Sequence, residues 1–339
     1  YAWCARILAA VYLDAAEKCL DEAQALGAGE ENVIAGAFIA AFRSQNASTG
    51  LAMLAGISTP QANTARFLIA ANKKEPAEAI KWLQEAGLSA ADLDSDGRFG
   101  VIQRRIASGA IDQALADVAA LSETDFEATP LLLHSAAITH LAGAIHPELR
   151  VGVIEPRPIG HDEFPLNSTP EALEHRTQAR SFYEKSREAF QRLGQARAAN
   201  MSSDYALWLS LRDVESRVDA RRVLETSMSD PQHRLRRLPM ALLFGVKLDK
   251  NAVELELERE ATRTGGKSAD LAVARFAMAR SQSDEAEVAA YIEKYRDQLT
   301  EYFNPTWIQA VEVETLAKSK QFDKARAVLL EVEKQDVPA

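Results

Sequence analysis

The stretch DLDSDGRFG, residues 92–100, has the acidic spacing with which calcium-binding loops begin. Carboxylates stand at loop positions one, three and five, as Asp92, Asp94 and Asp96. Position twelve, where such a loop needs a bidentate Glu, is Gln103, which offers one neutral oxygen. Acids that precede a helix satisfy its free N–H groups and favour its positive end. We therefore predict that these residues cap a helix, and we expect no metal site.

The segment ATRTGGKSAD, residues 261–270, ends like the phosphate-binding loop Gly-x-x-x-x-Gly-Lys-Ser. The first Gly of that motif is replaced by Ala261, and the preceding segment is acidic rather than a buried apolar strand. Without a strand before the loop and a helix after it, the backbone amides cannot form the phosphate cradle. We predict instead that Gly265 and Gly266 end one helix and that Ser268 caps the next.

Other catalytic patterns are missing from the sequence. No two histidines stand four residues apart with a carboxylate between them, and no Gly-x-Ser-x-Gly elbow occurs. Cys4 and Cys19 lack the CxxC spacing and cannot by themselves complete a zinc site. His134 and His140 lie in an apolar run, where we expect them to pack or form hydrogen bonds. The sequence thus predicts no catalytic residue and no cofactor.

The strongest charge feature is a cluster of arginines interleaved with acids. Its members are Arg212, Arg217, Arg221, Arg222, Arg234, Arg236 and Arg237. One interpretation is an exposed helix face on which opposite charges pair at i, i+4 spacing. The other is an anion clamp for an acidic peptide, a phosphate or a nucleic acid. In the second interpretation the binding residues are Arg221, Arg222, Arg236 and Arg237.

The composition limits the class of protein. The chain has 339 residues, of which 47% are hydrophobic and 26% charged, a balance typical of one large or two ordinary globular domains. Its net charge of −10 repels polyanions and disfavours nucleic acid as a partner. The longest apolar run, residues 131–145, is too short to span a bilayer. We expect no membrane interaction.

Two cysteines and no visible signal peptide are typical of a reducing compartment, so we expect a cytoplasmic protein. The chain begins at Tyr1 inside an apparently helical pattern and without an initiator Met. We therefore expect a fragment, whose flanking domains could carry an activity.

Apolar residues recur at three- and four-residue spacing along most of the chain, which predicts an all-α fold. The run VELELE, residues 253–258, alternates like a strand, but it lies among strong helix formers and we interpret it as helix. Seven times, a small residue is followed four positions later by an apolar partner. These pairs are Ala16/Leu20, Gly50/Leu54, Ala79/Leu83, Ala114/Val118, Ala220/Leu224, Ala286/Ala290 and Ala325/Leu329.

The first four of these small residues are separated by 34, 29 and 35 positions, and the last two by 39. A period near 34 with two short helices per unit is the spacing of tetratricopeptide arrays. A small residue lets the second helix of a hairpin approach the first closely. Because one hairpin cannot bury its apolar face alone, neighbouring hairpins must stack.

Three segments resemble the second helix of tetratricopeptide repeats: YLDAAEKCLDEAQALG (12–27), SGAIDQALADVAAL (108–121) and QFDKARAVLLEVEKQ (321–335). Residues 181–211 are similar to the repeats of bacterial signalling ATPases and regulators of the STAND type. Gly109 stands where the inter-helix Gly of the family belongs, while the Trp-Leu-Gly-Tyr pattern of the first helix is mostly missing. The resemblance implies a right-handed α-solenoid of stacked helical hairpins with an inner groove.

One segment interrupts the helical pattern. Residues 146–170 contain five prolines and cannot be helical over a useful length. We interpret the segment as a long insertion loop, either an ornate connection between repeats or a loop that lines the groove. The predicted organisation is therefore helical-hairpin repeats in residues 1–145, the insertion in 146–170, and further repeats in 171–339.

These patterns predict a non-enzymatic module that binds a protein or peptide in its concave groove. The resemblance suggests the sensor or assembly part of a larger bacterial regulatory or defence protein. Two alternatives stay open. The first is recognition of an anion or nucleic acid by the arginine cluster between Arg212 and Arg237, and the second is the helical repeat region of an enzyme whose catalytic domain lies outside this sequence. The sequence also leaves self-association open.

Overall fold

The structure, a computed structural model, describes Ala9 and residues 12–27, 29–72, 74–145, 166–281, 285–300 and 305–335. All regular structure in these residues is helical, which confirms the all-α prediction. They contain no strand, and a single isolated antiparallel bridge pairs Ile145 with Leu166. Within the same residues, no helix has both the length and the apolar composition needed to cross a membrane.

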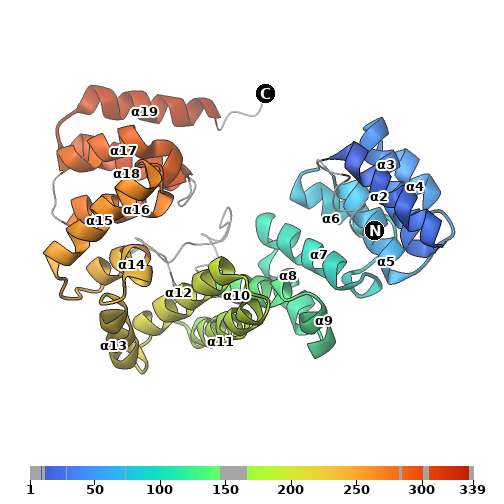
Figure 1. The fold of residues 1–339 in the computed structure, drawn as a ribbon, viewed down its shortest axis with the longest axis horizontal. Coiled ribbons are helices and arrows are strands. Elements are labelled where there is room, and N and C mark those ends of the chain that lie inside the picture. Colours follow the sequence, from blue (N-terminus) through green and yellow to red (C-terminus); the bar gives the residue numbers. More distant parts are fainter. Residues whose placement is uncertain are drawn as a thin grey trace. The chain divides into compact units, whose positions relative to one another are not determined.

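The described residues up to Ala199 form a first compact unit. Its helices are α2 (Leu13–Leu26), α3 (Glu30–Ser44), α4 (Ala47–Met53), α5 (Pro60–Ala71), α6 (Pro76–Glu85), η1 (Ala90–Asp92), α7 (Ser95–Ala107), α8 (Ile111–Ala119), α9 (Glu123–Ala128), α10 (Leu131–Gly143) and α11 (Pro170–Arg192). Helices that are neighbours in the chain pack on one another (Figure 1). In addition α3 packs on α5, α5 on α7, and α7 on α10.

The described residues from Asn200 onward form a second compact unit. Its helices are α12 (Ala196–Arg212, which begins in the first unit), α13 (Arg217–Ser227), α14 (Pro231–Leu243), α15 (Lys250–Thr264), α16 (Ala269–Ser281), α17 (Glu285–Thr300), α18 (Pro305–Lys318) and α19 (Phe322–Gln335). From α13 to α19 each helix packs on the next, and α14 also packs on α16. In both units, therefore, packing runs mostly between helices close together in the chain.

Of the three acids of DLDSDGRFG, Asp94 and Asp92 take part in capping, as predicted, while Asp96 lies inside α7 and caps no helix. The Asp94 carboxylate accepts a hydrogen bond from the Gly97 N–H at 2.9 Å and so caps α7. Asp92 accepts from the N–H and hydroxyl of Ser89 at the start of η1, and Asp96 accepts from the Thr129 hydroxyl at 3.0 Å. The three carboxylates thus bond to different residues, and each is already used as a hydrogen-bond acceptor.

The segment that imitates a phosphate-binding loop joins two helices, as predicted. Gly265 ends α15 in the left-handed conformation, with φ of 61°, which costs a residue without a Cβ little. Ser268 then caps α16, because its hydroxyl accepts from the Leu271 N–H at 3.3 Å. The alternating run VELELE lies inside α15, so its interpretation as helix is confirmed.

Several side-chain hydrogen bonds in the first unit join residues about 30 positions apart in the chain. They link Asn63 to Asp92, Thr64 to Asp94, Ser95 to Asp125, Asp96 to Thr129, and Gln103 to Ser135. The two partners are separated by 29 to 33 residues in every case. Several of these residues lie at or beside helix N-termini, so the bonds fix where successive helices begin relative to one another. We call this set the cap ladder.

Most of the predicted small residues are buried. Those buried are Ala16, Gly50, Ala79, Ala114, Ala220 and Ala325. Gly50 shows why size matters there: a Cβ on it would overlap the carbonyl oxygen of Ala37 and lie 2.9 Å from the Cβ of Ala41. Helix α4 therefore approaches α3 more closely than any larger residue would allow.

The prediction is wrong at Ala286/Ala290, because both residues are exposed. Helix α17 buries Val288, Ala289 and Ile292 instead. In the sequence EAEVAAYI, alanines occur on both faces of the helix, so the small-residue pattern fits two registers. The larger Val and Ile decide the register, since they gain more from burial. For the last pair, burial is confirmed for Ala325 but not for Leu329, which is exposed.

Helix α11 begins at Pro170, one residue earlier than predicted. Proline is tolerated at the first position of a helix, where its missing N–H would have no partner in any case. Thr169 caps this helix by accepting from the Ala172 N–H at 3.2 Å. Most of the predicted insertion, residues 146–165, lies outside the described residues.

We expect Gly50→Ala to lower the free energy of unfolding by about 1–3 kcal/mol, because the added methyl group must push α4 away from α3. The matched control is Gly29→Ala. Gly29 is the N-cap of α3, a Cβ there meets no atom within 4 Å and its φ of −152° suits alanine, so we expect a loss below about 1 kcal/mol, from the weaker N-cap alone. Urea unfolding followed by circular dichroism compares the two, and equal losses would contradict the close approach.

Candidate functional site

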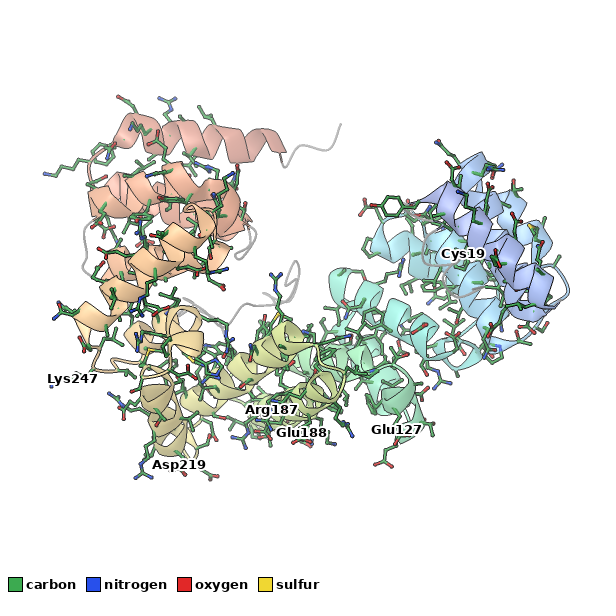
Figure 2. All side chains as sticks on the ribbon, in the orientation of Figure 1. Cys19, Glu127, Arg187, Glu188, Asp219 and Lys247 are labelled. Carbon is green, nitrogen blue, oxygen red and sulfur yellow. The ribbon has the colours of Figure 1, made fainter. Side chains whose placement is uncertain are left out.

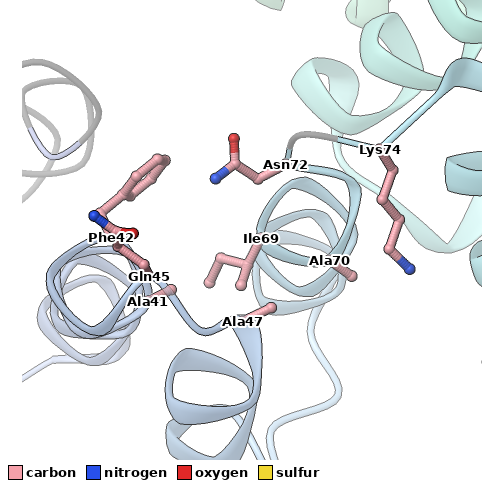
Figure 3. Close-up of a pocket in the computed structure, with 8 residues that line it drawn as sticks. All are labelled: Ala41, Phe42, Gln45, Ala47, Ile69, Ala70, Asn72 and Lys74. Carbon is pink, nitrogen blue, oxygen red and sulfur yellow. The ribbon is translucent and has the colours of Figure 1, made fainter. Parts of the chain in front are cut away.

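The first unit contains a hollow between the ends of consecutive helices. It lies where α3 ends, α4 begins and α5 ends, and its volume is about 180 Å³ (Figure 3). Its lining residues are Ala41, Phe42, Gln45, Ala47, Ile69, Ala70, Asn72 and Lys74. The lining combines an apolar part with amide and ammonium groups contributed by residues at or after the helix ends. A hollow with this composition suits a partly apolar side chain that also carries a hydrogen-bonding group.

Local sequence explains why this hollow is not filled. Helix α3 ends at Ser44, and Gln45 follows in the left-handed conformation with φ of 52°. Asn46 then caps α4 by accepting from the Ser48 N–H at 3.0 Å, so α4 begins almost immediately. The walls consist partly of alanines, whose side chains end at Cβ and leave space between the helices.

Two of the predicted anion-binding residues, Arg221 and Arg222, lie on the exposed helix α13. Arg221 pairs with Glu225 at 3.0 Å, and one of its guanidinium nitrogens donates to the carbonyl of Gly245 at 2.8 Å. Arg222 pairs with Asp219 at 3.0 Å, and both side chains are largely exposed. Figure 2 shows Asp219 on the exposed side of α13. Exposed pairs of this kind contribute about 0–1 kcal/mol each. This half of the cluster matches the interpretation as a helix face with paired charges.

The other two, Arg236 and Arg237, lie on α14 and converge on one buried carboxylate. The Arg237 Nε donates to Asp204 Oδ1 at 2.8 Å, and the Arg236 Nε donates to Asp204 Oδ2. Arg237 also donates to the Ser203 hydroxyl at 3.2 Å. The Asp204 side chain is 4% exposed and that of Arg237 is 8% exposed. This pairing is a structural joint between α12 and α14.

His233 lies beside this joint, with its Nδ1 3.2 Å from a guanidinium nitrogen of Arg236. Burial lowers the pKa of His233, and the positive charges of Arg237 and Arg236 lower it further. Asp230 and Asp204 oppose these effects without cancelling them. His233 is therefore neutral at pH 7 and adds no positive charge to the cluster.

The remaining arginines of the cluster also have partners within the chain. The guanidinium of Arg212 lies 5.2 Å from the centre of the buried Trp208 ring. Arg217 donates to the Leu211 carbonyl at 3.0 Å, and Arg234 donates to the Met228 carbonyl at 2.7 Å. The structure thus distributes the cluster over three helices and pairs it internally. Binding of an anion by these residues stays a prediction.

The two histidines of the apolar run pack, as predicted. His140 and His175 face each other across α10 and α11, with their Nδ1 atoms 3.1 Å apart. Burial, and then the neighbouring His175, lowers the pKa of His140 to about 4. The His140 ring stacks on Phe182, and His134 meets the Tyr183 ring edge-on at 5.4 Å. These side chains form part of the contact between α10 and α11.

A second, polar hollow occurs in the second unit between α16, α17 and α18. It is lined by Arg280, Glu285, Val288, Val311, Glu314, Thr315 and Lys318. Lys318 pairs with both Glu285 and Glu314, so much of the charge in this hollow is already balanced. In the residues that the structure describes, no three metal-ligating side chains gather at one place.

The described residues thus include a partly apolar hollow in the first unit and a polar hollow with paired charges in the second. No protein-family model matches this chain, and comparisons with curated proteins and with solved structures found no match. The functional interpretation consequently depends on the arrangement of this chain's own residues.

Sequence reasoning missed Asp204 and the hollow. A signal for Asp204 exists, because it precedes Arg236 and Arg237 by 32 and 33 residues, the same separation that the cap ladder has in the first unit. An acid one repeat before a pair of arginines could have been recognised as their partner. The hollow leaves no such signal, because alanine is frequent throughout the chain.

Replacing Asp204 with Ala should lower the free energy of unfolding by about 3–5 kcal/mol, because two largely buried guanidinium groups lose their shared carboxylate. Asp219→Ala is the matched control. Asp219 also pairs with an arginine but its side chain is 83% exposed, so we expect a change within about 0.5 kcal/mol. Urea unfolding of both variants checks this, and a small loss for Asp204→Ala would show that the joint is dispensable.

Proposed function

We propose that this chain is a non-enzymatic helical repeat module that binds a peptide segment of another protein. The first helices of successive hairpins, α3, α5, α7 and α10, provide the binding face. The proposal includes a right-handed solenoid in which these helices line the inner groove. It also includes a cytoplasmic location, supported by the scarcity of cysteine, and a role as the sensor or assembly part of a larger bacterial regulatory protein.

The packing order supports this proposal. Each of these first helices packs on the next one, α3 on α5, α5 on α7 and α7 on α10, so the four helices form a continuous row. Repeat proteins that stack in this way present extended surfaces made of side chains from successive repeats. Such a surface suits an extended or helical peptide better than a small substrate.

The single observation that carries the proposal is the hollow between α3 and α5. Cavities of about 150 Å³ hold a molecule of benzene, so 180 Å³ is enough for one apolar or aromatic side chain. Gln45 and Asn72 belong to the same lining and carry amides that can form hydrogen bonds with a peptide backbone. The hollow therefore has the composition of a pocket for one anchor residue of a bound peptide.

A random peptide library displayed on phage, panned against the whole chain, tests the proposal. We expect selected peptides to share an apolar or aromatic anchor. Ala47→Phe, which fills the hollow, should weaken their binding at least tenfold without lowering the melting temperature. Ala52→Phe, at an exposed position of the same helix, should leave binding unchanged. If panning yields no peptide above background, or if both variants bind equally well, the proposal is wrong.

A further inference from the structure

Arg104 on α7 is half-buried against the neighbouring first helix. Its guanidinium lies 5.1 Å from the centre of the Phe67 ring of α5, in the arrangement of a cation–π contact. One of its terminal nitrogens donates to the carbonyl of Gly100 at 3.1 Å. Burial lowers the pKa of Arg104, but a guanidinium remains charged at neutral pH.

This arginine differs from its neighbours in having no acidic partner. Arg98 pairs with Asp125 at 2.8 Å, and Arg105 pairs with Asp117 at 3.0 Å. Within the described residues no carboxylate lies within ion-pair distance of Arg104. A partly desolvated charge without a counter-charge is costly, and an incoming anion would relieve that cost.

The surroundings hold the guanidinium in a defined orientation. Gly100 has no side chain, and a Cβ there would lie 3.4 Å from both an Arg104 nitrogen and the Phe67 ring. The ring of Phe67 supports one face of the guanidinium plane, while Nε and the second terminal nitrogen have no described acceptor. These two nitrogens form the edge of the fork that binds a carboxylate with two parallel hydrogen bonds.

Arg104 and the hollow share helix α5. The guanidinium lies over Phe67, and the lining of the hollow begins two residues later, at Ile69. The hollow lies on the side of α5 toward α3, and Arg104 lies on the side toward α7, so a peptide reaches both only if it extends across α5. The low polarity around Phe67 strengthens an ion pair formed there relative to one in water.

From this geometry we infer that Arg104 is the receptor for a carboxylate group of the bound peptide. The inference rests on the proposed peptide-binding function and names the class of partner: a peptide with an apolar anchor and an acidic group nearby. That group is either an Asp or Glu side chain or the free C-terminus of the partner, since both present the same planar oxygen pair.

Nuclear magnetic resonance of the whole chain, labelled with ¹⁵N at arginine, tests the receptor directly. The Nε–H resonance of Arg104 is identified as the one that disappears in Arg104→Lys. N-acetyl-glutamate amide represents the acidic side chain and N-acetyl-alanine the free C-terminus, while the neutral N-acetyl-glutamine amide is the matched control. We expect a saturable shift with a carboxylate, half-complete at a concentration on the order of millimolar, and none with the control.

The probe that shifts the Arg104 resonance at the lower concentration shows whether the carboxylate belongs to an acidic side chain or to a free C-terminus. If neither carboxylate probe shifts the Arg104 resonance, the inference is overturned. An equally large shift of the exposed Arg43 would also overturn it. A response to inorganic phosphate without a response to carboxylates would overturn the assignment of the ligand class.

The stability of two neighbouring variants provides a second test. Arg104→Met keeps the contact with Phe67 and removes an unpaired charge, so its melting temperature should be unchanged or higher. Arg105→Met leaves the half-buried Asp117 without its partner and should lower the melting temperature by several degrees. If both variants are equally destabilised, Arg104 has a structural role and the inference fails.

The outcomes also separate this inference from the proposed function. Peptides that Ala47→Phe weakens, but that bind Arg104→Met as tightly as the wild type, would leave peptide binding intact and remove the carboxylate receptor. If small carboxylates shift the Arg104 resonance but panning yields no peptide, Arg104 binds carboxylates and the proposed peptide-binding function is wrong.

Discussion

The close approach of neighbouring helices determines how the described parts of this chain pack. At Gly50 the backbone of α3 occupies the space where a larger side chain would begin, and the buried alanines of other hairpins allow similar packing. Close contact between sequence neighbours buries apolar surface locally, so each hairpin depends mainly on the hairpins before and after it. The cap ladder adds a polar counterpart, since its hydrogen bonds fix the starting points of successive helices about one repeat apart. The proposed binding face depends on this packing, because the first helices can form a continuous row only if their spacing is uniform.

Within this arrangement, several buried carboxylates pair with arginines of other helices. Asp125 illustrates the rule: burial opposes its ionisation, but hydrogen bonds from Ser122 and Ser95 and the charge of Arg98 lower its pKa below the ordinary value. Asp204 has the same role toward Arg236 and Arg237 in the second unit. Arg104 departs from the rule, because it is half-buried and faces an aromatic ring instead of an acid. Its aromatic partner Phe67 belongs to α5, the helix that also borders the hollow of the first unit.

The sequence predicted the helices, their caps and most of the close contacts, since each of these depends on residues within one or two turns of each other. Asp94 and Ser268 are recognisable as caps from their position before an apolar run, and Gly265 from its position after one. The register of α17 was missed because alanines on both faces made the short-range pattern ambiguous. The hollow and the isolation of Arg104 depend on the absence of side chains and counter-charges that other helices could have supplied. Such absences arise from three-dimensional packing and have no local pattern in the sequence.

Native-state hydrogen exchange of the whole chain, measured by mass spectrometry at increasing low concentrations of urea, tests most directly whether packing is local. If each helix is stabilised mainly by its sequence neighbours, amides should become exchangeable in contiguous groups of a few helices, each group with its own opening free energy and its own dependence on urea. The groups should also respond separately, so that opening of α17–α19 leaves the protection of α3–α7 unchanged. A single opening free energy shared by all protected amides from α2 to α19 would contradict this account, because it would show one cooperative core in place of a series of neighbouring ones.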